Sequence, residues 1–234
     1  MPKPNQLTHY HDGTPSVLRK KSVYTELYFY QKSDVLVQLT QSFCDRFFAK
    51  YGDRTVDQMK QAARSTKQNI AEGLTDGQTS FEVEIKLLGI AKGSNQELLE
   101  DYQDYLKHLG VKEWSECNIE RYNKLREYCK ANSKDEAFHP FYTIWTDIEM
   151  ANCAICLCHM VDKAMTSFLE NRDKQFVAEG GIRERMTAAR LEMRGTQKEI
   201  IEQQAHEIEQ LQAEIASLRR ELAVLKGIMP KHPE

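Results

Sequence analysis

Side chains that can bind a metal are concentrated in one short segment, residues 153–159. Cys153 and Cys156 have the spacing with which many zinc sites begin, and Cys158 and His159 follow them. On a helix, Cys153 and Cys156 lie close together while Cys158 points elsewhere, and no second pair of ligands with zinc spacing follows. We therefore expect buried cysteines that fill a helical core, and no metal site.

Long basic side chains near residues 54–67 form a candidate phosphate-binding face. Lys60, Arg64 and Lys67 are spaced by four and three, so they share one face of a helix, and Arg54 precedes them. Such a face fits nucleic-acid binding that weakens with added salt. It fits equally a solvated face that pairs with acidic neighbours, for which the candidates are Glu97, Glu100, Asp101 and Asp104.

A second basic group follows the Gly180-Gly181 pair. Arg183, Arg190 and Arg194 fall on one side of a short predicted helix, beside an apolar stripe. The first interpretation is a second nucleic-acid contact on a segment that the glycines allow to reorient. The alternative is an amphipathic connector whose arginines keep it soluble.

No group of residues indicates catalysis. Ser65, Asn69, Ser94 and Asn95 lack a nearby base, so we expect them to hydrogen-bond neighbouring helices and fix their register. Phosphate-binding loops, dinucleotide-binding glycine patterns and zinc-protease or hydrolase motifs are absent from the sequence. The expectation is a protein without catalytic residues and without a cofactor.

Composition favours long helices, because only 11 of the 234 residues are Gly and 6 are Pro, while 29% are charged. The net charge of -3 argues against a protein built simply to coat nucleic acid. Neither a signal peptide nor an apolar run long enough to span a bilayer is present in the sequence. We expect a cytoplasmic protein with six reduced cysteines and no membrane partner.

Hydrophobic periodicity predicts an all-α fold in five parts. The parts are a flexible basic arm (1–23), a four-helix bundle with an extra short helix (24–179), an Arg-rich helix (180–195), a coiled coil (196–229) and a tail (230–234). Either 116–130 or 142–177 is the fourth helix of the bundle. Gly89 and Gly93, opposite Ala62 and Ala63, predict a close approach of two helices. A helix is predicted to end at Gly73, the next to start near Thr79, and a later one to break at Gly195.

The C-terminal segment carries a heptad repeat with β-branched residues at a and Leu at d, which favours a parallel dimer. At its g and e positions, Glu214 would face Arg219, and Glu221 would face Lys226, of a partner chain. An amphipathic helix folding back on its own bundle would need a wider apolar stripe. The residues predicted to drive self-association are Ile201, Ile208, Leu211, Ile215, Leu218, Leu222 and Leu225.

Three segments resemble a bacterial family of four-helix-bundle proteins. The segments are DRTVDQMKQAARSTKQNIAEG (53–73), IAKGSNQELLE (90–100) and FVAEGGIRERM (176–186). The family includes proteins encoded in intervening sequences of large-subunit ribosomal RNA genes, and the accessory variability determinant of diversity-generating retroelements. The last segment resembles the "four helix bundle suffix" domain of one subgroup.

The resemblance implies an antiparallel up-and-down bundle, often a homopentamer, in contrast to the dimer that the heptads predict. For the retroelement protein it implies partnership with a reverse transcriptase and contact with RNA or DNA through a basic surface. The family pattern has two arginines before the alanines, where this chain has Lys60-Gln61. The leading hypothesis is a non-enzymatic nucleic-acid-binding accessory protein, and the alternative is an oligomerisation scaffold that recruits a protein partner without nucleic acid.

Overall fold

The computed structural model describes residues 7–18, 23–48, 54–77 and 80–228. Over these ranges the protein is all-α, as predicted, apart from two strands of two residues each. The elements are β1 (Thr8–His9), β2 (Pro15–Ser16), η1 (Tyr24–Glu26), α1 (Tyr28–Phe47), α2 (Arg54–Asp76), α3 (Phe81–His108), α4 (Trp114–Cys117), α5 (Ile119–Ala131), α6 (Asp135–Phe138), η2 (His139–Phe141), α7 (Asp147–Glu179) and α8 (Ile182–Ile228).

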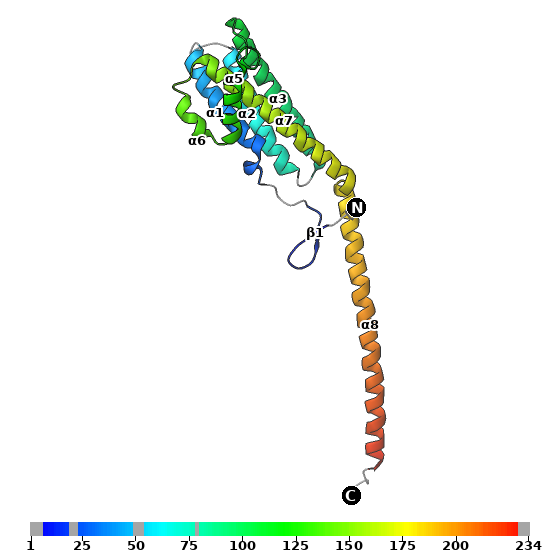
Figure 1. Ribbon diagram of the computed structural model, residues 1–234. Coiled ribbons are helices and arrows are strands. Elements are labelled where there is room, and N and C mark those ends of the chain that lie inside the picture. The colour runs from blue at the N-terminus through cyan, green and yellow to red at the C-terminus, as the bar shows by residue number, and fades with distance from the viewer. Residues whose placement is uncertain (1–6, 19–22, 49–53, 78–79, 229–234) are drawn as a thin grey trace. The chain divides into compact units, whose positions relative to one another are not determined.

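The chain divides into two compact units. Residues 18–182 form the core unit, and residues 5–17 together with 183–234 form the tail unit. In the core unit, α1 contacts α2 and α7, and α3 contacts the same two helices (Figure 1). Of the two candidates for the fourth long helix, it is therefore α7 that packs against α1 and α3, whereas α5 contacts α7 and α4.

Helix α7 is buried on every side over part of its length, because other helices surround it. Residues 150–158 are all buried, and α1, α3 and α5 each contact this helix. A helix without a polar face is stable in water only when it is covered in this way. It begins at Asp147 rather than at the predicted Tyr142, because Thr146 and Glu149 form a reciprocal capping box there.

Two predicted features of α2 and α3 are wrong. Helix α2 continues past Gly73 to Asp76, and Gly73 lies close to α3: a Cβ added there would be 3.1 Å from Leu87 Cβ. Gly89 and Gly93 are exposed, and a Cβ added at either would meet nothing within 4 Å. The predicted start at Thr79 lies outside the described residues; the N-cap of α3 is Ser80, whose hydroxyl accepts from Val83 N at 3.3 Å.

Helix α5 is held at its C-terminus by a buried lysine of α1. The Lys32 ammonium group donates to the carbonyl oxygens of Cys129 and Asn132, which no further turn of α5 can satisfy. It also lies 4.9 Å from the centre of the Tyr28 ring. Positive charge at a helix C-terminus is favourable, so Lys32 can stay buried there although burial lowers its pKa.

In the tail unit, β1 and β2 form a small hairpin that packs on α8. The predicted arm without regular structure is therefore wrong for residues 8–16: Gly13, with φ of 80°, makes the turn. Arg185 of α8 is buried and donates to the Val17 carbonyl at 3.0 Å, and His9 pairs with Glu192 at 2.5 Å. The basic residues of the arm, at positions 3 and 19–21, lie outside the described residues.

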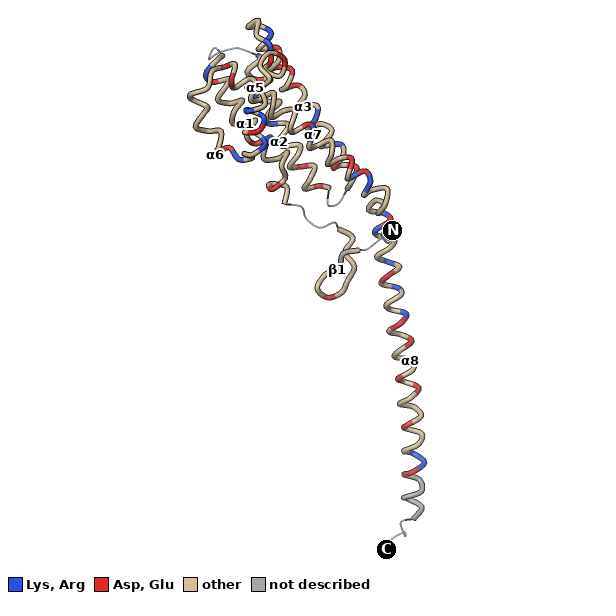
Figure 2. Tube along the Cα trace, viewed as in Figure 1, with Lys and Arg blue, Asp and Glu red and all other residues tan. Residues whose placement is uncertain are grey.

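The predicted helix break at Gly195 is also wrong. The structure has one continuous helix over the predicted Arg-rich helix and coiled coil, α8 (Ile182–Ile228). A glycine inside a helix costs about 1 kcal/mol relative to alanine, which strong helix formers on both sides can outweigh. Basic and acidic residues are interspersed along this helix (Figure 2).

Candidate functional site

The basic face predicted on α2 is partly neutralised by α1. Lys60 pairs with Asp45 at 2.7 Å, and the hydrogen bond from Lys60 lowers the pKa of Asp45. Lys67 pairs with Asp34, also on α1. The expected acidic partners were those of α3, so that part of the alternative reading is wrong: the pairs join α2 to α1 instead.

Arg54 and Arg64 are the exposed members of this face, and neither makes an ion pair with a described carboxylate. Arg64 and Lys67 line a hollow of about 240 Å³ together with Tyr30. The Lys67 ammonium lies 5.8 Å from the centre of the Tyr30 ring. The α2 face can therefore offer an anion two arginines and one aromatic ring, rather than four free cations.

The three predicted arginines of the second group are all exposed on α8. Arg183, Arg190 and Arg194 make no ion pair with a described carboxylate, so their charges are available to a ligand. Their neighbour Arg185 is different, because its guanidinium holds the hairpin. The structure therefore separates one structural arginine from three that face solvent.

Of the polar residues expected to hydrogen-bond a neighbouring helix and fix the helix register, Asn95 does so. Asn95 of α3 is buried, and its side-chain amide donates to the Cys158 carbonyl of α7 at 3.0 Å. Asn69 differs from the expectation, because it donates to Ser65 O within its own helix at 2.8 Å. Between α1 and α3, Tyr102 donates to Thr40 Oγ1 at 2.9 Å, a contact that the sequence did not suggest.

The three cysteines of α7 are buried, as predicted, and two of them, Cys153 and Cys156, lie near a fourth cysteine, Cys129 of α5. The sulfur atoms of Cys129 and Cys153 are 3.8 Å apart. A hydrogen bond with Cys153 raises the pKa of Cys129, and a hydrogen bond with Cys129 together with burial raises that of Cys156. These thiols stay protonated at neutral pH. Among the described residues, no group of three His, Cys, Asp or Glu side chains could hold a metal ion.

The heptad residues of α8 form an apolar stripe, interrupted by Gln204 at one d position, that is exposed in a single chain. The exposed fraction lies between 48 and 64% for Ile201, Ile208, Leu211, Ile215, Leu218 and Leu222. The side chain of the seventh predicted residue, Leu225, lies outside the described residues, as does Met229. No other described residue covers these six side chains.

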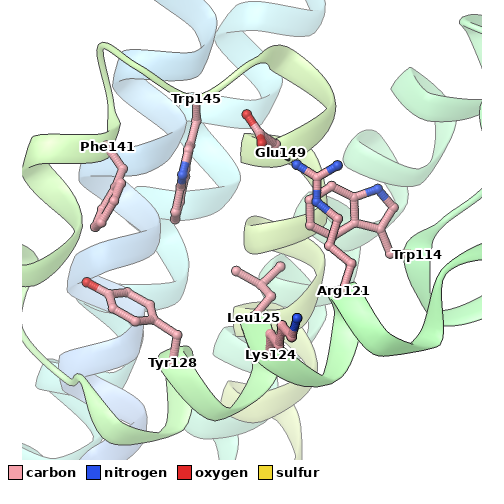
Figure 3. A pocket seen from close by; sticks show the side chains of 8 residues that line it. All are labelled: Trp114, Arg121, Lys124, Leu125, Tyr128, Phe141, Trp145 and Glu149. Carbon is pink, nitrogen blue, oxygen red and sulfur yellow. Dashed lines mark hydrogen bonds and ion pairs between the residues drawn. The ribbon is translucent and has the colours of Figure 1, made fainter.

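An aromatic pocket beside α5 was not foreseen from the sequence. It measures about 280 Å³ and lies between α5, α4, η2 and α7. Figure 3 shows Trp145 on one side of it and Arg121, stacked over Trp114, on the other, with Leu125 below. The Arg121 guanidinium lies 4.1 Å from the Trp114 ring centre and pairs with Glu149.

The signal for this pocket is spread over three segments of sequence. Trp145 stacks on Phe141 with ring centres 4.8 Å apart, ahead of α7, while Tyr128 comes from α5. No helical period relates these residues, so pattern reasoning on single helices misses them. Flat apolar walls beside Arg121 and Lys124 suit a flat ring or an aromatic side chain.

Three comparisons with known proteins found no match. No protein-family model and no curated protein matches the sequence, and no solved structure matches the fold. Across the described part of the chain, no helix is both long enough and apolar enough to cross a bilayer.

Proposed function

We propose that this protein is a non-enzymatic scaffold that self-associates through α8 and thereby gathers several core units. The observation that carries the proposal is the exposed a and d stripe of six Ile and Leu residues. Burying one such side chain contributes about 1.5–3 kcal/mol, so six per chain can offset the cost of association. The stripe is narrow, as in a coiled coil, rather than wide, as in a helix that covers a large core.

Parallel pairing is part of the proposal. β-Branched residues at a with Leu at d favour two parallel strands. Glu214 and Arg219 are exposed, and neither pairs with a described residue of its own chain, so both are available to a partner helix. In a parallel pair these two side chains attract each other across the interface.

The proposal also includes the arrangement of the core unit as an antiparallel, up-and-down four-helix bundle. Its support is that α1, α2, α3 and α7 contact one another in a closed cycle. The links from α1 to α2 and from α2 to α3 are only 6 and 4 residues long. Short links join antiparallel neighbours in helix bundles.

Light-scattering mass of the full chain tests self-association. The variant Ile208→Asp with Ile215→Asp is expected to be monomeric, because each buried carboxylate opposes pairing. The matched control is Ala213→Asp with Ala216→Asp, which adds the same charge at exposed positions off the stripe and should keep the wild-type mass. A monomeric wild type, or equal masses for both variants, contradicts the proposal. A mass of five chains rather than two would favour the pentamer that the resemblance implies.

Disulfide trapping tests the parallel orientation. In a Cys117→Ser background, which removes the exposed cysteine, Ile201→Cys and Leu222→Cys are made separately and then mixed. Parallel pairing should join each variant to itself on oxidation, because positions 201 and 222 are both a positions, and equivalent a positions of two parallel helices lie within disulfide reach. Crosslinks found only in the mixture would mean antiparallel pairing.

Nucleic-acid binding is a second candidate function, favoured by the exposed arginines on α2 and α8. Self-association would multiply Arg54 and Arg64 of the core unit and the three exposed arginines of the tail unit. The resemblance adds a reverse transcriptase as the protein partner to test. We expect binding of single-stranded RNA or DNA that weakens steeply with salt.

Charge reversal separates this candidate from the scaffold. Arg54→Glu with Arg64→Glu should weaken oligonucleotide binding about tenfold or more without changing the oligomer mass. Arg54 and Arg64 are tested rather than Lys60, because Lys60→Glu would also place a second negative charge beside Asp45 and repel it. Lys86→Glu with Lys174→Glu is the control, since both lysines are exposed on other helices. Absence of binding by the wild type at low salt rejects this candidate and leaves the scaffold standing.

A further inference from the structure

A second cavity in the core unit is lined by cations and contains no acidic residue. It measures about 560 Å³ and lies between α1, α5 and α7. Small-molecule sites commonly have volumes of about 300–1,000 Å³. Its lining includes the cations Arg126, Lys130 and Lys163, together with His159.

Two helices supply this lining as two regular rows. Tyr122, Arg126 and Lys130 are spaced by four along α5, so they share one face of that helix. His159, Lys163 and Ser167 are spaced by four along α7 in the same way. Because α5 packs against α7, the two rows border one cavity.

The arginine and the two lysines of this cavity are not neutralised by described carboxylates. Of the described residues, no carboxylate pairs with Arg126, Lys130 or Lys163. Some cations elsewhere in the unit do have such a partner: examples are Lys60–Asp45, Lys67–Asp34, Lys92–Asp162, Arg121–Glu149 and Arg172–Glu84. Like charges gathered around one cavity repel one another and attract anions.

The back of the cavity adds to the positive potential. The Tyr28 ring lines it, and the buried ammonium of Lys32 lies 4.9 Å from the centre of that ring. Tyr28 donates its hydroxyl to the Met160 sulfur at 3.3 Å, a weak acceptor that a stronger one can replace. The cavity thus offers an anion several cationic donors, a hydroxyl and aromatic walls.

We propose that this cavity binds a small molecule that carries a phosphate group, with Arg126, Lys130 and Lys163 on the phosphate and Tyr28 and Tyr122 beside the rest of the ligand. Arginine and lysine are the side chains that bind phosphate best, arginine by its two-pronged geometry and lysine as a point charge. The volume fits a mononucleotide-sized ligand rather than a bare ion. The site is separate from the stripe on α8, so it stands whether or not the chain self-associates.

Calorimetric titration of the full chain tests the proposal with three probes at low salt. The probes are inorganic pyrophosphate, AMP, and a single-stranded oligonucleotide without a terminal phosphate. We expect pyrophosphate and AMP to bind, and AMP to bind more tightly because its base adds contact with the tyrosine rings. Binding of the oligonucleotide alone, or of none of the probes, overturns the proposal.

A pair of matched double variants locates the site. Arg126→Glu with Lys163→Glu should weaken AMP binding by about tenfold or more, since each lost contact is a hydrogen bond to a charged group. The control, Lys86→Glu with Lys174→Glu, makes the same charge change at exposed positions of α3 and α7 that line neither pocket. An equal loss of AMP affinity in both double variants would mean that only the net charge matters, and it would overturn the proposed site.

Folding of the variants is checked by their thermal unfolding. All four substituted side chains are exposed, so their unfolding temperatures should stay close to that of the wild type. If the first double variant is destabilised, Arg126→Gln and Lys163→Gln made singly give the same comparison. Unchanged AMP affinity in both single variants would overturn the assignment.

Discussion

At the scale of single residues, charge pairing decides which side chains are left for binding. Lys60 and Lys67 share a helical face with Arg64, yet both are held by aspartates of α1. Arg126 and Lys163 have no such partners and border a cavity. The free cations, rather than the most regular basic pattern, are therefore the better candidates for ligand contacts.

Arg172 of α7 is expected to be important for stability, because it pairs at 2.8 Å with Glu84, whose side chain is fully buried on α3. Arg172→Leu should destabilise the core unit by about 3 kcal/mol, since it removes the ion pair with a fully buried carboxylate. The control is Lys107→Leu, which breaks the exposed pair with Asp104 and should cost under about 1 kcal/mol. Chemical denaturation measures both, and equal costs would contradict the prediction.

Asp101 is expected to make stability depend on pH. Burial, together with Asp104, Glu97 and Glu100 nearby, raises its pKa from 3.8 to about 6. A carboxyl whose pKa is raised by folding binds its proton more tightly in the folded state. Its stabilising contribution is therefore present below pH 3.8 and is lost as the pH rises through about 6.

Replacement of this carboxyl by an amide tests the effect. Asp101→Asn should raise the unfolding temperature at pH 7 and change it little at pH 4. The gain is expected to be about 1 kcal/mol, less than the full pKa shift implies, because Asp101 is partly exposed to solvent. Glu127→Gln, at an exposed carboxylate of α5, is the control. A gain as large at pH 4 as at pH 7 would refute the interpretation.

At the scale of helices, close packing depends on one glycine that the small-residue pattern did not single out. Gly89 and Gly93 have the regular spacing but face open space, whereas Gly73 faces the backbone of α3. The spacing of small residues indicates where helices can approach, but burial decides where they do. Gly73 is buried and the other two are exposed.

Alanine substitution should separate these glycines. Gly73→Ala is expected to lower the unfolding temperature, because its Cβ would lie 3.1 Å from Leu87 Cβ, a rigid atom, and force α2 from α3. Gly89→Ala should raise stability by up to about 1 kcal/mol, since alanine is the better helix former and the site is open. Thermal melts compare the two directly, and the opposite order would contradict the assigned close approach.

At the scale of the whole molecule, α8 carries an apolar stripe that no other described part of the chain covers. A long helix gains most of its stability from packing of such a stripe rather than from helix propensity. If the stripe packs against another copy, the stability of α8 must depend on protein concentration.

Circular dichroism melts at several protein concentrations test this dependence. We expect the unfolding of α8 to move to higher temperature as concentration rises. In Ile208→Asp with Ile215→Asp, the helix should melt at a lower temperature that no longer depends on concentration. A wild-type melting temperature that is independent of concentration would argue against self-association.

The sequence by itself determined the helical character of the protein and the position of its heptad stripe. The scarcity of Gly and Pro and the helical spacing of apolar residues are properties of single helices. The local sequence pattern is therefore sufficient to predict them. The buried cysteines of α7 and the exposed face of α8 belong to this group. The breaks expected at Gly73 and Gly195 failed because a single unfavourable residue costs less than the helix around it contributes.

Only the tertiary structure decided which charges are neutralised and where pockets lie. The aspartates that bind Lys60 and Lys67, and the Lys32 that holds α5, come from elements distant in sequence. Both pockets beside α5 likewise join side chains of three or more elements. Pairing and concavity depend on which helix faces meet, and no period along one helix contains that information.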